Sequence, residues 1–158
     1  MARPKPKITA EFRPACAEDE DAVLRFMRAL EAEDPGRTPF DEEQRRHIFR
    51  EFGAKPALGA IWLIEVEGKA AGYAILTFGY SFEFGGRDAF VDELYIAREH
   101  RGRGIGKTAM AVFEAEARKC GVQALHLGVT NSNSVAIKTY TRAGFSDHEG
   151  RRIMTKRL

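Results

Sequence analysis

Three glycines occupy alternate positions among cationic residues in the segment Arg101-Gly102-Arg103-Gly104-Ile105-Gly106-Lys107. A strand-like apolar run ends just before it at Ile96, and apolar residues recur at helical spacing from Ile105 onward. Glycine lets a backbone turn sharply and approach a ligand closely, and a helix N-terminus presents unpaired N–H groups to an anion. The segment therefore predicts a strand–turn–helix unit with a phosphate-binding site at the turn.

Periodicity along the rest of the chain predicts a mixed α/β domain built around one sheet. Strands are expected at residues 8–12, 61–66, 72–79, 89–96 and 124–129, with a last short strand around Ile153. Helices are expected from about residue 19 to a stop at Pro35-Gly36, and over 41–52, 105–120 and 135–143. Turns at residues 67–69 and 85–88 join the middle three strands into an antiparallel meander.

The length and composition of the chain limit the classes of protein to which it can belong. Its 158 residues suit one domain spanning 1–158, and 44% hydrophobic with 30% charged residues is typical of a globular protein. The 25 basic residues barely exceed the 23 acidic ones, for a net charge of +2. We therefore expect no nucleic-acid partner, although this total allows a local basic site. No apolar run approaches the roughly 20 residues of a membrane span, so the sequence predicts a soluble, cytoplasmic protein without a membrane partner.

Two common phosphate-binding patterns each miss the glycine segment by one residue. A Walker A loop would need glycine five positions before Gly106, where Arg101 stands. The dinucleotide pattern G-x-G-x-x-G, begun at Gly102, would need glycine where Lys107 stands. A nucleotide-phosphate-binding protein is thus an alternative that rests only on Gly106-Lys107-Thr108.

A different pattern, R-x-x-G-x-G, does match from Arg101 to Gly106, directly after the predicted strand. Together with Asn133-x-x-Ala136 and Tyr140-x-x-x-Gly144-Phe145, it resembles the GNAT superfamily of acetyl-CoA-dependent N-acetyltransferases. The motifs occupy residues 91–145, and their lengths and register look most like those of the small-amine, spermidine/spermine-type members. The resemblance implies a single-domain GNAT-like fold, a mixed and mostly antiparallel central sheet with splayed central strands, flanked by about four helices.

The resemblance also implies where acetyl-CoA, the co-substrate, would bind. The backbone amides of the glycine segment would bind its pyrophosphate, and the main chain of the preceding strand would pair with its pantetheine arm. Asn133, which also suits a helix N-cap, would contact the cofactor. The implied cofactor-binding residues are Leu94, Tyr95, Ile96, Arg101, Gly102, Arg103, Gly104, Ile105, Gly106, Lys107 and Asn133. No metal is implied.

Acetyl transfer to an amine needs a proton acceptor for the amine and a proton donor for the leaving thiolate. By resemblance, Tyr140 would protonate the thiolate, because a phenol stays a neutral donor near pH 7. Asp92 or Glu93 would accept the proton or anchor the amine, directly or through a water. Alternation along a strand predicts that these two side chains point to opposite faces, so that one of them faces the acceptor.

The local charges suggest how two substrates would be recognised. Residues 98–107 carry four cations against Glu99, or +3, where cofactor phosphates would bind, and residues 31–43 carry −5, where a cationic acceptor could approach. The leading hypothesis is acetylation of a primary amine of a small molecule. The alternatives are acetylation of a protein lysine or N-terminus and a non-catalytic acyl-CoA-binding module. Similar enzymes also suggest a homodimer.

Overall fold

A computed structural model describes residues 8–34, 39–147, 150 and 153–158 of the chain. These residues form two compact units, one reaching Gly128 and the other beginning at Val129. That residues 1–158 act as a single domain stays a prediction.

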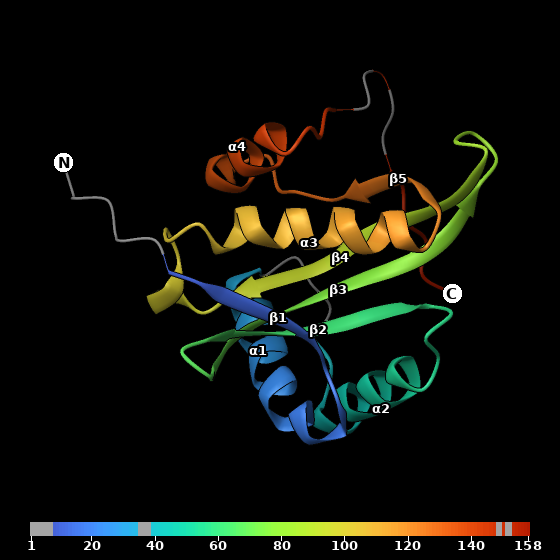
Figure 1. Ribbon diagram of the computed structural model, residues 1–158. Coiled ribbons are helices and arrows are strands. Elements are labelled where there is room, and N and C mark those ends of the chain that lie inside the picture. Colours follow the sequence, from blue (N-terminus) through green and yellow to red (C-terminus); the bar gives the residue numbers. More distant parts are fainter. Residues whose placement is uncertain (1–7, 35–38, 148–149, 151–152) are drawn as a thin grey trace. The chain divides into compact units, whose positions relative to one another are not determined.

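The first unit is built on a five-stranded sheet whose spatial order follows the chain order (Figure 1). Strands β1 to β4 are antiparallel neighbours, and β4 and β5 are parallel. The strands are β1 Ala10–Pro14, β2 Gly59–Val66, β3 Lys69–Ser81, β4 Gly86–Ile96 and β5 Val122–Leu127. The antiparallel meander β2–β3–β4 was expected, and its first turn at Glu67 and Gly68 has positive φ at both residues, as a tight hairpin requires.

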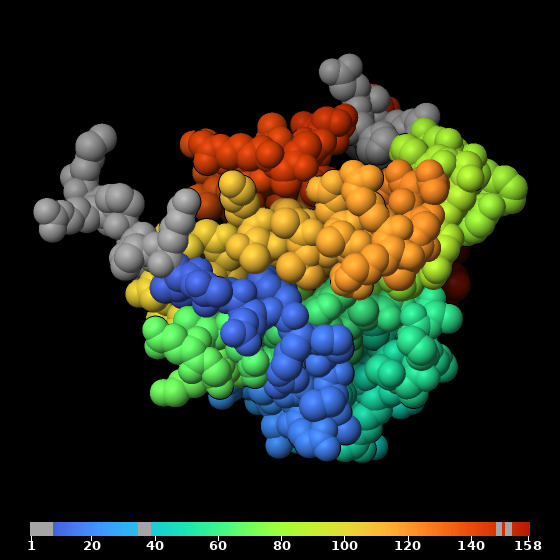
Figure 2. All heavy atoms as spheres, viewed as in Figure 1, coloured from blue at the N-terminus to red at the C-terminus, as the bar shows by residue number. Residues whose placement is uncertain are grey.

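Three α-helices of this unit, α1 Glu20–Glu33, α2 Glu42–Gly53 and α3 Ile105–Lys119, cover the two faces of the sheet. Helices α1 and α2 lie on one face and α3 lies on the other (Figure 1 and Figure 2). Two 3₁₀ turns, η1 Ala17–Asp19 and η2 Arg98–His100, precede α1 and α3. With both faces covered, residues 61–64 of β2 and 71–74 of β3 are all buried, and the apolar runs of these strands are almost unbroken.

Alternate residues of β2 divide between two apolar layers. Ile61 and Leu63 pack with Phe26 of α1 and Phe49 of α2. Trp62 faces α3 instead, where its ring contacts Phe113 at a centroid distance of 5.6 Å. Apolar residues at helical spacing form the buried faces of α1 and α3.

Strand β4 pairs with β5 over only part of its length. The parallel register runs from Arg87↔Val122 to Val91↔Leu127 and ends there. Among the described residues of this unit, the last five residues of β4 therefore have no strand partner on the β5 side. This divergence of the central strands, with the five-stranded mixed sheet and its flanking helices, confirms the expected α/β fold.

Two expectations about the ends of the chain need correction. The first strand is Ala10–Pro14, shifted from the expected 8–12, because its backbone continues to pair with β2 as far as Pro14↔Trp62. The described residues 153–158, which include Ile153, form no strand, and their side chains are exposed. A strand requires a pairing partner as well as a short apolar pattern.

The second unit contains α4, Ser134–Arg142, with both ends capped as the sequence predicts. The Asn133 side chain accepts a hydrogen bond from the Ala136 N–H at 3.1 Å. Gly144, at φ 95°, takes the left-handed conformation that ends many helices.

Candidate functional site

The glycine segment forms the turn into α3, as expected. Gly102 and Gly104 have φ values of 75° and 93°, and Gly104 is the N-cap of α3. These left-handed conformations are strained for any residue with a Cβ, which explains glycine at both positions. Among the described residues, the N–H groups of Ile105 and Gly106 find no hydrogen-bond acceptor. The turn therefore exposes the positive end of a 15-residue helix, suited to an anion.

Arg101 is held firmly by protein groups. Its Nε donates to the Ile96 carbonyl at 2.6 Å, and its guanidinium lies 5.1 Å from the ring centroid of Tyr95. Its two terminal nitrogens donate to the Glu33 carboxylate at 2.8 and 3.1 Å. Arg98 donates to the same carboxylate at 2.9 Å. Arg101 thus fastens the end of β4 to the end of α1.

The other two cations of the segment are differently placed. Arg103 is half-buried, and its Nε is fully covered without a hydrogen-bond partner among the described residues. Lys107 is exposed on the first turn of α3 and makes no ion pair within the described part of the chain. Arg98 and Arg101 are thus paired with Glu33, whereas Arg103 and Lys107 have no carboxylate partner among the described residues.

The acidic stretch between α1 and α2 is largely neutralised by arginines. Besides Glu33, Glu31 receives hydrogen bonds from the buried Arg45. Glu42 accepts two hydrogen bonds from Arg28, at 2.9 and 2.7 Å. The negative charges of these three residues are therefore paired with arginines. They do not form the open acidic surface for a cationic acceptor that the net charge of −5 along the sequence suggested. The residues at 35–38 of this stretch lie outside the described part.

The Glu33 contacts make the stability of this unit depend on pH. Arg101, followed by Arg98, lowers the pKa of Glu33 from 4.5 to about 2. Because the folded pKa lies below the unfolded one, the stabilisation is complete above about pH 4.5 and is lost as the pH falls toward 2. We expect Glu33→Gln to lower the free energy of unfolding by about 1 kcal/mol at pH 6 and by progressively less toward pH 2.

This expectation can be checked by denaturant unfolding of both proteins at pH 6 and pH 3. The control is Glu11→Gln, which removes an exposed carboxylate that has no side-chain partner among the described residues. If Glu33→Gln and Glu11→Gln shift the unfolding midpoint equally at both pH values, the ion pairs with Arg101 and Arg98 do not stabilise the fold.

Leu94, Tyr95 and Ile96 lie on the part of β4 that has lost its β5 neighbour. On the other side this part still pairs with β3, from Ala74↔Leu94 to Gly72↔Ile96. A strand held on one edge and open on the other can accept the main chain of an extended ligand as an additional strand. The structure thus provides the open edge that the predicted pantetheine contact requires.

Asp92 and Glu93 lie on the same face of the sheet, so the prediction of opposite faces is wrong. The register passes from Leu76↔Val91 to Ile75↔Glu93, which leaves Asp92 as an extra residue in β4. Such a β-bulge interrupts the alternation of side chains. Glu93, opposite Ile75, therefore points toward α1, and Asp92 does so as well.

The two carboxylates have different surroundings on that face. Glu93 is 9% exposed and accepts a hydrogen bond of 2.5 Å from the hydroxyl of Tyr73. Asp92 is exposed, and its side chain makes no hydrogen bond or ion pair with the described residues. Asp92 also lines a cavity of about 80 Å³ with apolar residues of α1, α2, β2 and β3. Of the two, Asp92 is the carboxylate that a ligand can reach.

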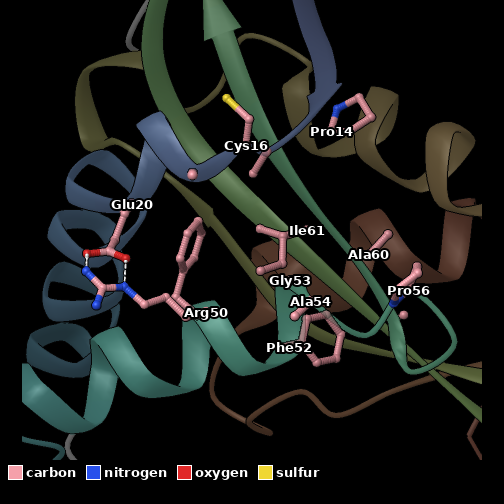
Figure 3. Close-up of a pocket in the computed structure, with 14 residues that line it drawn as sticks. Pro14, Cys16, Glu20, Arg50, Phe52, Gly53, Ala54, Pro56, Ala60 and Ile61 are labelled. Atoms are coloured by element: carbon pink, nitrogen blue, oxygen red, sulfur yellow. Dashed lines mark hydrogen bonds and ion pairs between the residues drawn. The ribbon is translucent and has the colours of Figure 1, made fainter.

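A larger cavity of about 650 Å³ adjoins this small one and shares Phe49, Phe52 and Ile61 with it (Figure 3). It is lined by residues of β1, η1, α1, α2 and β2, with the loops between them, and by none of the predicted site residues. On one wall Glu20 and Arg50 form two hydrogen bonds, at 2.6 and 2.9 Å. The larger of the two cavities is therefore not the one that the predicted catalytic residues line.

Asn133 and Tyr140 belong to the second unit. Asn133 caps α4, and its backbone N–H donates to the Thr130 carbonyl at 2.8 Å. Tyr140 is half-buried, and its ring lies 6.2 Å from that of Phe145. Burial raises the pKa of the Tyr140 phenol above 10. The phenol therefore stays protonated throughout the neutral range and can donate a proton.

Two residues near the site were not predicted from the sequence. Tyr73 is the partner of Glu93, and the only sequence signal for it is a polar hydroxyl within an apolar strand. Glu33 was counted in the acidic stretch without its arginine partners, which lie 65 and 68 positions away in the chain. Contacts across such distances depend on strand pairing, which local patterns do not contain.

Comparisons with known proteins agree on one fold. An integron cassette protein from the mobile metagenome of Cole Harbour Salt Marsh is 30% identical, with a TM-score of 0.81 over 93% of this chain and 90% of that one. A predicted acetyltransferase from Clostridium acetobutylicum, solved with acetyl-CoA, is 18% identical, with a TM-score of 0.74 over 93% and 96% of the two chains. At that identity the second likeness concerns the fold alone.

The sequence comparisons name the family. Streptothricin acetyltransferase from Streptomyces lavendulae is 34% identical over 83 residues, which are 52% of this chain and 42% of that protein. The chain spans about half the length of the first curated relatives it matches. Residues 23–145 match the acetyltransferase (GNAT) family. The chain belongs to this family. Among the residues that the structure describes, no helix is long and apolar enough to cross a membrane.

Proposed function

We propose that this protein transfers the acetyl group of acetyl-CoA directly to a primary amine of a small molecule. The observation that carries the proposal is the proximity along the chain of two binding features. The last residues of β4 have an open edge, and within ten residues the chain reaches the N-terminus of α3, where the N–H groups of Ile105 and Gly106 have no acceptor among the described residues. An extended thioester arm ending in phosphates suits this succession of an edge and an anion site.

Acetyl-CoA fits the residues present at this turn. The free N–H groups of Ile105 and Gly106 would donate to a pyrophosphate, and Arg103 and Lys107 would balance its charge. Arg101 supports this site indirectly, since its contacts with Ile96 and Glu33 hold the turn in place. Leu94, Tyr95 and Ile96 would align the arm through their main chain.

In the proposed reaction the amine nitrogen attacks the thioester carbonyl carbon with its lone pair. A C–N bond forms, the C–S bond breaks, and the sulfur leaves with its electron pair. The amine releases one proton to a carboxylate, directly or through a water, and the thiolate gains one from a donor. The products are an N-acetylated amine and free coenzyme A, so no covalent enzyme intermediate is needed.

Asp92 is the better proton acceptor of the two candidates. It is exposed beside a cavity, whereas Glu93 is buried and already accepts the Tyr73 hydroxyl. We assign Glu93 a positioning role, because its bond to Tyr73 ties the bulge of β4 to the neighbouring strand. Tyr140 is proposed as the proton donor for the thiolate, and Asn133 as a cofactor contact, on the strength of the family motif.

The proposal is tested by thermal melting and by a thiol-release screen. We expect acetyl-CoA at 100 times its Kd to stabilise the protein by about 2.7 kcal/mol, while ATP with magnesium leaves the melting temperature unchanged. Thiol release from acetyl-CoA should then depend on added alkylamines, and product mass should rise by one acetyl group. Stabilisation by ATP and not by acetyl-CoA would contradict the proposal, as would a better rate with lysine peptides than with any small amine.

A further inference from the structure

We propose that the acceptor is a monoamine with a compact apolar body, rather than a polyamine or an amino acid. The inference rests on the proposed function, and it names the substrate class of that same site. It is carried by the small cavity beside the bulge of β4, in which Asp92 is the one charged residue among the described lining residues.

The cavity beside Asp92 has one charged lining group and otherwise almost wholly apolar walls. Its nine lining residues are Val23, Met27, Ile48, Phe49, Phe52, Ile61, Ile75, Thr77 and Asp92. Among these, Thr77 is the only uncharged polar residue, and its hydroxyl contacts the Phe90 carbonyl at 3.5 Å. A volume of about 80 Å³ accommodates a few carbon atoms. An alkyl group in this cavity would place an attached ammonium group beside the Asp92 carboxylate.

A second positive charge on the acceptor would find no free carboxylate among the lining residues. The acidic groups at the end of α1 already pair with arginines, Glu31 with Arg45 and Glu33 with Arg98 and Arg101. Glu20, at the start of α1, is likewise shared by Arg46 and Arg50. A polyamine whose second ammonium entered the cavity would therefore have to break an existing ion pair or leave that ammonium desolvated without a partner, and both are costly.

A carboxylate on the acceptor would be disfavoured for the opposite reason. None of the nine lining residues is cationic. The α-carboxylate of an amino acid, two bonds from its amine, would lie close to Asp92 and be repelled by it. The charge arrangement thus disfavours both added charges and favours an amine whose remaining atoms are apolar.

Three amines with similar carbon chains test this inference on the wild-type protein. 3-Methylbutylamine is the reference, leucine adds a carboxylate to the same skeleton, and 1,4-diaminobutane adds a second amine to a similar chain. We expect kcat/KM for 3-methylbutylamine to exceed both others by about tenfold or more. Equal or better kcat/KM for either charged analogue would overturn the inference and leave the proposed acetyl transfer intact.

A pair of variants at Ile48 connects this selectivity to the cavity. Ile48 lies on α2, lines the cavity and is 37% exposed, so a polar side chain there is tolerable. Ile48→Glu supplies a second carboxylate, and we expect it to raise the ratio of kcat/KM for diamine over monoamine about tenfold. Ile48→Gln, of the same size without the charge, should leave the ratio near its wild-type value. An unchanged ratio in Ile48→Glu would show that the acceptor binds elsewhere.

The failures of the two proposals are distinguishable. If acetyl-CoA neither stabilises the protein nor releases thiol with any amine, the proposed function fails and the inference fails with it. If acetyl transfer occurs but the charged amines are preferred, only the inference fails. Thermal melting of each Ile48 variant confirms that a change in rate does not reflect unfolding.

Discussion

Asp92→Asn is expected to lower kcat/KM for amine acetylation about 10²- to 10³-fold. The asparagine keeps the size of the side chain but can neither take the proton from the amine nor pair with its charge. We expect most of the loss at neutral pH, where the amine is protonated, and a smaller loss as rising pH deprotonates the amine in solution. The measurement is kcat/KM against pH for both proteins, with acetyl-CoA saturating.

Glu93→Gln is the matched comparison for this prediction. Its side chain can still accept the hydrogen bond from Tyr73, so the bulge of β4 should remain in place. We expect a smaller loss of kcat/KM than in Asp92→Asn and an unchanged shape of the pH profile. If Glu93→Gln instead abolishes the reaction while Asp92→Asn is active, the proton acceptor is Glu93 and the positioning role passes to Asp92.

Tyr140→Phe is expected to lower kcat about 10²-fold while stabilisation by acetyl-CoA persists. The variant removes one hydroxyl and leaves the ring, so the loss is that of the proton donor for the departing thiolate. The burial that raises the pKa of Tyr140 keeps this donor protonated over the neutral range. The measurement is single-turnover acetyl transfer together with thermal melting in the presence of acetyl-CoA.

The control for Tyr140 is Tyr80→Phe, which removes the hydroxyl of a tyrosine that is 69% exposed on β3. This variant should leave both the rate and the melting temperature unchanged. A Tyr140→Phe protein with wild-type single-turnover rate would remove Tyr140 from the chemistry and return the protonation of sulfur to solvent.

Local sequence patterns were sufficient to predict most of the helices, strands and turns, because the residues that specify each of them lie within a few positions of one another. Gly104 ends the turn before α3, and Asn133 caps α4, through contacts that span at most a few positions. The stripes of α1 and α3 were likewise legible, since burial of one helix face repeats every three or four residues. The strand predicted around Ile153 is wrong, because a local apolar pattern does not show whether a pairing partner exists.

The sequence alone determined the order and type of most of the elements, the anion-suited turn and the family resemblance. The glycine segment was the strongest of these signals. Only the tertiary structure decided which charges remain available. Strand pairing and helix packing bring Glu33 to Arg98 and Arg101, and this leaves Arg103 and Lys107 for a ligand. An unpaired residue in β4 likewise turned Asp92 and Glu93 to one face. A bulge and a long-range ion pair depend on register between distant segments, which no local spacing specifies.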